Sequence, residues 1–264
     1  MSLETHLDSA RERVRSERDA VQKKQTAYKR FITRVKNLSP GSIQSGSQVT
    51  ALASGGTQLL DQSVQTETDC AAVRTAFRET IRPHSVDDLD DEEPLLQTIR
   101  AELSESLAIA VAPTTETRLT VDLQEAIVTE AQSQRVDLQA MEAALNRERD
   151  QLATAADTLT PIIEWLIDVN ETPLLDVGFE GLADRHSTLE SHRDSCEQLL
   201  LDRQTFLQET TSQAAHAGIV HRSLIQYLYQ DFPIDYPALS TGIRLDELCA
   251  ESQRAVRDHL VRRV

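Results

Sequence analysis

Apolar residues recur every seven positions along much of the second half of the chain, and this period restricts the fold more than any other feature. One set of positions holds Ala131, Leu138, Leu145, Leu152, Leu159 and Leu166. The companion set, four residues earlier, holds Ile127, Gln134, Met141, Glu148, Ala155 and Ile162. A seven-residue repeat keeps one face of a helix against a partner helix. It predicts a long helix over about residues 117–158, which ends before Pro161.

Two other segments carry similar patterns. The first helix is predicted over residues 2–38, where the seven-residue set is Leu7, Val14, Val21, Tyr28 and Val35. The other is predicted over residues 180–217, where spacings of three and four join Leu182, His186, Leu189, Arg193, Cys196, Leu200, Arg203 and Leu207. A helix with an apolar stripe needs a partner that buries it. Because the three segments have similar lengths, we expect an elongated, coiled-coil-like bundle of three long antiparallel helices.

Shorter helices are predicted between and after the long ones, and we expect them to cluster at one end of the bundle. Their ranges are about 68–82, 94–111, 161–169, 219–230 and 238–261. Residues 39–66 hold Pro40 and four of the eight glycines, which favours a flexible linker with one helical turn near residues 49–53. The expected all-α chain therefore has a basic N-terminal coiled-coil helix (1–38), a flexible linker (39–66) and a helical body (67–264).

The chain is strongly acidic, with a net charge of −16 and a pI of about 4.8. Only four of its 27 basic residues are lysines. An excess of carboxylates with few lysines is what a protein exposed to very high salt would show, because salt screens the mutual repulsion of the carboxylates. The composition therefore favours adaptation to a salt-rich cytoplasm. An acidic surface that meets a basic partner is the alternative.

The N-terminal helix has the opposite charge. Residues 11–36 hold ten basic residues and three acidic ones, and all four lysines are among them. The candidate interaction residues are Arg11, Arg15, Arg18, Lys23, Lys24, Lys29, Arg30, Arg34 and Lys36. Such a helix could bind nucleic acid or anionic lipid, or it could pair with acidic helices of its own chain. We favour internal pairing, since no helix-turn-helix signal and few aromatic residues accompany the basic ones.

The sequence contains none of the common catalytic motifs: no glycine-rich nucleotide-binding loop, no nucleophile elbow, no H-E-x-x-H and no C-x-x-C. His192 and Cys196 are four residues apart, as are His186 and Glu190, a spacing that can place two metal ligands on one helix face. Two ligands do not complete a site, so we interpret them as surface or seam residues. The sequence predicts no enzyme activity, no cofactor and no metal.

Other features favour a soluble protein of the cytoplasm. The first ten residues lack the apolar core of a signal peptide, and no run approaches the length of a membrane-spanning helix. The three cysteines, Cys70, Cys196 and Cys249, are predicted to be buried free thiols. The acidic run 87–93 is interpreted as a solvated helix start rather than a cation site. The aromatic residues of segment 227–236 are interpreted as a small core rather than a recognition surface.

The C-terminal stretch FPIDYPALSTGIRLDELCAESQRAVRDHL, residues 232–260, resembles the end of a helical protein family of unknown function from haloarchaea. The remainder of the chain agrees with that family only in layout. The resemblance implies a salt-loving archaeal source and supplies no catalytic residue.

The leading functional hypothesis is therefore a non-enzymatic structural or protein–protein interaction module, which binds a protein partner or a second copy through its helices. The alternative hypothesis is a nucleic-acid-associated or regulatory protein that uses the basic N-terminal helix. No insertion into a membrane is expected.

Overall fold

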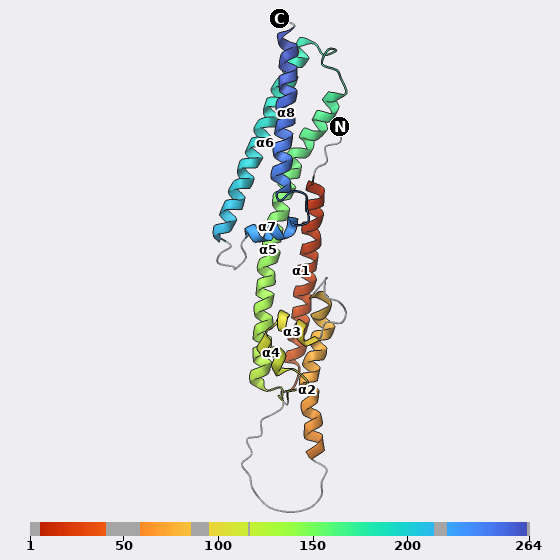
Figure 1. Cartoon of the computed structure of the whole chain (residues 1–264), viewed down its shortest axis with the longest axis vertical. Helices are drawn as coiled ribbons and strands as arrows, with labels where there is room; N and C mark the ends of the chain where they lie inside the picture. Colours follow the sequence, from red (N-terminus) through yellow and green to blue (C-terminus); the bar gives the residue numbers. More distant parts are fainter. Residues whose placement is uncertain (1–5, 41–58, 86–94, 116, 214–220, 263–264) are drawn as a thin grey trace, which may run out of the picture. The chain divides into compact units, whose positions relative to one another are not determined.

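The computed structural model describes residues 6–40, 59–85, 95–115, 117–213 and 221–262 (Figure 1). Within these ranges the chain is helical and has no strand, which confirms the predicted all-α class. The α-helices are α1 (Leu7–Lys36), α2 (Leu59–Thr80), α3 (Leu95–Glu102), α4 (Glu105–Ala110), α5 (Val121–Asn170), α6 (Phe179–Gln213), α7 (His221–Tyr229) and α8 (Pro237–Val261). A 3₁₀ turn, η1 (Arg82–His84), follows α2. None of these described helices is long and apolar enough to cross a bilayer.

The contacts divide the chain into two compact units. Unit 1 comprises Met1–Arg18 and Ala143–Val264, and unit 2 comprises Asp19–Glu142. The boundaries fall inside α1 and α5, so each of these helices contributes one part to each unit.

In unit 2, the second part of α1 packs against the first part of α5. Gln25 donates a hydrogen bond to the carbonyl oxygen of Leu138 at 3.1 Å, and Gln124 donates one to the carbonyl oxygen of Val35 at 2.7 Å. These pairs run in opposite directions along the chain, so the two segments are antiparallel. The buried core joins α1, α2, α3, α4 and α5, and its centre includes an edge-to-face pair between Phe31 and Phe77, with ring centroids 5.8 Å apart.

In unit 1, the second part of α5 and α6 form an antiparallel pair joined by residues 171–178. Trp165 contacts His192 near the connection, with ring centroids 4.9 Å apart. Helix α8 lies beside α6 and is antiparallel to it (Figure 1). A Cβ atom on Gly242 of α8 would lie 3.1 Å from a methyl group of Leu200 on α6, so the two helices approach closely where α8 has no side chain.

Helix α5 continues through Pro161, so the predicted helix end at residue 158 and the separate helix 161–169 are wrong. Proline removes one backbone hydrogen bond and crowds the preceding turn. Pro161 lies on the exposed face, where water can bind the carbonyl group that loses its partner. Leu159 and Ile162, on either side, are buried and hold the helix against its neighbours.

The substitution Pro161→Ala is expected to raise the free energy of unfolding by about 1–3 kcal/mol, because alanine restores the hydrogen bond and favours the helix. Chemical denaturation of the two proteins, followed by circular dichroism, measures this difference. The matched control is Thr160→Ala, an exposed neighbour whose change is expected to shift stability by less than about 0.5 kcal/mol. A less stable Pro161→Ala protein would show that the packing of α5 depends on the proline.

Other boundaries also differ from the sequence predictions. Helix α2 begins at Leu59, so residues 59–66 of the predicted linker are helical. The predicted helix 94–111 is divided into α3 and α4, because Ser104 leaves the helical conformation and its hydroxyl oxygen accepts a hydrogen bond from the Leu107 amide. The long helix predicted from residue 117 begins at Val121, where the Thr120 hydroxyl accepts from the Leu123 amide.

The short helices do not form the single predicted cluster. Helices α2, α3 and α4 belong to unit 2, whereas α7 and α8 belong to unit 1. The helical turn predicted near residues 49–53 and the acidic run 87–93 lie outside the described residues.

Candidate functional site

Several positions on the predicted seams hold charged residues instead of apolar ones, and the structure pairs them with partners from other helices. Arg193 of α6 donates to Asp246 of α8 at 3.0 Å and to Gln253 at 3.4 Å. Glu148 pairs with Arg203, and Lys24, which lies three residues after Val21 in the companion set of the first helix, pairs with Glu102. These seam charges therefore specify which helices lie together.

The most buried of these pairs joins three helices of unit 1. The side chain of Glu148 on α5 is fully buried, and that of Arg203 on α6 is 5% exposed. One carboxylate oxygen, Oε1 of Glu148, accepts from Arg203 Nη2 and from the Tyr229 hydroxyl of α7, both at 2.7 Å. Burial and the Glu148 carboxylate raise the pKa of Tyr229, so the phenol remains a hydrogen-bond donor. Sequence reasoning did not select this cluster, although Glu148 and Arg203 both interrupt apolar seams.

Unit 2 contains a similar cluster. Glu102 of α3 accepts from Lys24 at 2.7 Å and from the Tyr28 hydroxyl at 2.7 Å, and both donors lie on α1. Burial and the charge of Glu102 raise the pKa of Tyr28. A raised pKa keeps both phenols protonated near neutral pH, so each hydroxyl donates to a carboxylate on another helix and joins the two helices.

The nine predicted interaction residues fall into two groups, and the five of the first group are either paired with a carboxylate or partly buried. Arg11 pairs with Asp8, Arg15 with Glu12, Lys24 with Glu102, and Arg34 with Glu79. Arg18 is partly buried, and its Nε atom is buried without a hydrogen-bond partner among the described residues.

The second group is Lys23, Lys29, Arg30 and Lys36. All four side chains are exposed, and none forms an ion pair with any residue that the structure describes. On a helix with 3.6 residues per turn, Lys23 and Arg30 form one row and Lys29 and Lys36 another. Both rows lie on the face opposite the buried residues Tyr28 and Phe31. No acidic residue occurs between positions 20 and 36. These four residues are called the basic face.

A polar groove of about 400 Å³ borders the basic face. It lies between α1 on one side and the end of α2 with η1 on the other. Lys23, Arg30 and His84 contribute basic groups, and Asp19 and Glu79 contribute carboxylates. The basic face and this groove belong entirely to unit 2.

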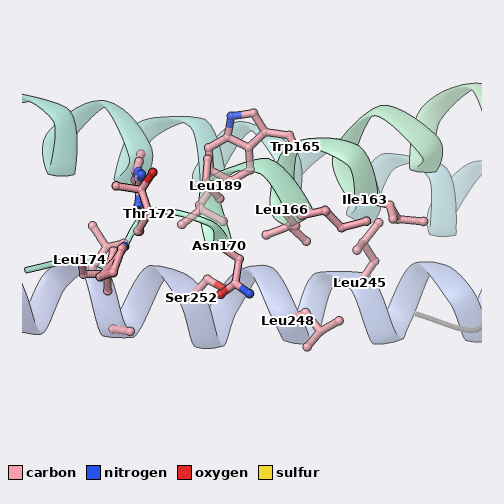
Figure 2. A pocket seen from close by; sticks show the side chains of 16 residues that line it. Ile163, Trp165, Leu166, Asn170, Thr172, Leu174, Leu189, Leu245, Leu248 and Ser252 are labelled. Carbon is pink, nitrogen blue, oxygen red and sulfur yellow. Dashed lines mark hydrogen bonds between the residues drawn. The ribbon is translucent and has the colours of Figure 1, made fainter. Parts of the chain in front are cut away.

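A second groove, also of about 400 Å³, lies in unit 1 between the end of α5, the connection 171–178, α6 and α8. Figure 2 shows side chains of α5 and α8, among them Leu166 and Leu245, in the space between the helices. Most lining residues are apolar; the exceptions are Asn170, Thr172, Arg185 and Ser252. This feature is called the apolar groove. No sequence pattern indicated this groove, because its walls come from three separate segments.

The described residues contain no group of three or more histidine, cysteine or acidic side chains placed to hold a metal ion. His192 and Cys196 lie one turn apart on α6, where Cys196 is buried and His192 packs on Trp165. Burial lowers the pKa of His192. All three cysteines are free and buried, as predicted, and burial raises the pKa values of Cys196 and Cys249 to about 11 and about 12.

In the aromatic segment 227–236, one tyrosine is part of a small core and another lies at the surface. Tyr229 is buried and contacts Phe232, with ring centroids 5.4 Å apart, as a small core requires. Tyr227 is 47% exposed and lies under the Arg13 guanidinium, and its hydroxyl donates to Glu17 at 3.2 Å.

Comparison with protein families finds one match: the model described as a domain of unknown function, DUF7260, covers residues 5–253 and hence most of both units. No curated protein and no solved structure matches the chain.

Proposed function

The chain belongs to the family of the domain of unknown function DUF7260, and we propose that it is a non-enzymatic protein-interaction module. Its basic face, Lys23, Lys29, Arg30 and Lys36, binds an acidic surface of a partner protein. The observation that carries this proposal is that these four cations are exposed and unpaired among the described residues of a chain with a net charge of −16.

The distribution of charge supports this proposal. Basic residues that serve packing, such as Lys24, already have carboxylate partners. The four residues of the basic face would repel one another less if an acidic surface covered them. Charge complementarity at an exposed rim contributes mainly to partner selection and to the rate of association.

We also propose that the protein works in a salt-rich cytoplasm of haloarchaeal type. This condition restricts how a partner can bind the basic face. Salt screens exposed charges, so a partner must also contact the exposed uncharged residues between the two basic rows, Thr26 and Thr33. We also propose that α1, α5 and α6 form one antiparallel coiled-coil bundle, which would present the basic face on a rigid support.

The proposal predicts that a variant with all four basic-face residues changed to glutamine loses at least about 90% of the partner that the tagged full chain captures in molar potassium chloride, because a complementary charge pair contributes several-fold to affinity even when screened. Glutamine is chosen because its helix propensity is close to that of lysine and arginine. Size-exclusion chromatography with light scattering shows whether the partner is a second copy.

The matched control carries the same change of charge at Arg11, Arg15, Arg100 and Arg149, whose exposed ion pairs contribute little to stability. This control should capture the partner as the unmodified chain does. Equal loss in both variants, or a reproducible catalytic turnover, contradicts the proposal. Tight duplex DNA binding that falls steeply with salt and disappears only in the basic-face variant would replace it with the nucleic-acid alternative.

A further inference from the structure

The apolar groove has the composition of a small-molecule site. Its volume of about 400 Å³ lies within the range of about 300–1,000 Å³ that is usual for ligand sites. Such sites combine mostly apolar walls with a few polar groups that orient the ligand. Here the walls include Leu166, Leu189 and Leu248.

The groove is elongated along α8. Five residues of this helix line it: Leu245, Leu248, Ser252, Ala255 and Val256. Their spacing places them on one helix face over eleven positions, or about 16 Å at 1.5 Å per residue. Figure 2 shows Leu245, Leu248 and Ser252 along the same ribbon. A linear chain fits this shape better than a compact ring system.

The lining of the apolar groove also includes one positively charged side chain. Arg185 of α6 is the one charged residue that lines the groove. Its Nη1 atom donates to the carbonyl oxygen of Thr172 at 3.3 Å, which leaves the remaining guanidinium donors available. Arg185 forms no ion pair with the residues that the structure describes, whereas Arg193, two turns further along α6, pairs with Asp246. In an acidic chain, an unpaired guanidinium beside an apolar groove attracts an anion.

We infer that the apolar groove binds a single-chain amphiphile whose anionic head contacts Arg185 and whose aliphatic tail lies between α5 and α8. The head is a carboxylate or a phosphate, since both accept paired hydrogen bonds from a guanidinium. This inference goes beyond the proposed function and concerns the other unit, so neither depends on the other.

The chain supplies its own reporter for this site. Trp165 is the only tryptophan in the sequence, and it lines the groove. Decanoate, added below its micelle concentration to the full chain, is expected to change the Trp165 emission in a saturable way. Isothermal titration calorimetry should give the same midpoint. Monodecyl phosphate is expected to bind too, and its affinity relative to decanoate identifies the preferred head.

The charge of the head is tested with Arg185→Gln. This variant is expected to bind decanoate about tenfold or more weakly, since a charge-assisted hydrogen bond is lost. Decanol is expected to bind both proteins equally and more weakly than decanoate binds the unmodified chain. The matched control is Arg254→Gln, which removes an exposed arginine of α8 that does not line the groove. The control should bind decanoate normally.

Several results would overturn the inference. One is the absence of decanoate binding by both fluorescence and calorimetry, and another is equal decanoate affinity in the Arg185→Gln variant and the unmodified chain. Binding to anionic phospholipid vesicles without binding of decanoate would identify a membrane surface instead. Ala255→Phe, which narrows the groove, provides a second test: unchanged decanoate affinity in that variant would place the amphiphile elsewhere.

Discussion

Substitution of Glu148 by alanine is expected to lower the free energy of unfolding by about 3–5 kcal/mol, because it leaves the Arg203 guanidinium buried without its counter-charge. The side chains of this pair are 0% and 5% exposed, so water cannot replace the lost partner. The Tyr229 hydroxyl also loses its acceptor, which loosens the attachment of α7 to α5. Chemical denaturation followed by circular dichroism measures the loss.

The adjacent exposed pair provides the control. Asp150 pairs with Arg149 on the same turn of α5, and Asp150→Ala is expected to cost less than about 1 kcal/mol. A double variant, with Glu148 and Arg203 both changed to methionine, should be more stable than the variant that lacks Glu148 alone, since no unpaired charge remains. If the double variant were the less stable of the two, the unpaired charge of Arg203 would not be the cause of the loss in Glu148→Ala.

Substitution of Phe31 by alanine is expected to lower the free energy of unfolding by about 3–5 kcal/mol, through loss of buried area and formation of a cavity in unit 2. Phe31 is fully buried, and its edge-to-face contact with Phe77 adds to the loss. The same denaturation measurement applies.

Ile109 of α4 is the matched control for this change, since it is apolar, belongs to the same unit and is 57% exposed. Ile109→Ala is expected to change stability by less than about 0.5 kcal/mol. A cost for Phe31→Ala below about 1 kcal/mol would mean that α1 is not part of the core of unit 2.

The long helices could be predicted because their signal is repeated: Leu145, Leu152 and Leu159 lie on one face and are all buried. Local signals were less informative. Pro161 suggested a helix end, yet the burial of its neighbours outweighs one missing hydrogen bond on an exposed face. The beginning of α2 at Leu59 was missed because a polar, serine- and threonine-containing segment carries little apolar period.

The candidate sites also differ in how far the sequence predicts them. The basic face could be identified as a set of residues, because all its members belong to one helix. Which members were paired could not be predicted: Lys24 meets a carboxylate 78 positions away, whereas Lys23 meets none among the described residues. No sequence pattern predicts the apolar groove, because Leu166, Arg185 and Leu248 become neighbours only through tertiary packing.

The two units differ in how they are laid out along the sequence. Unit 2 is one uninterrupted stretch, Asp19–Glu142, whereas unit 1 is assembled from segments on both sides of it. Leu7, Ala10 and Val14 are at most 4% exposed, so a fragment that begins at Ala143 would lack part of its own interior. Along the chain, unit 2 is therefore one continuous segment that lies between the two segments of unit 1. A fragment that keeps the whole interior of unit 1 therefore needs residues from both sides of unit 2.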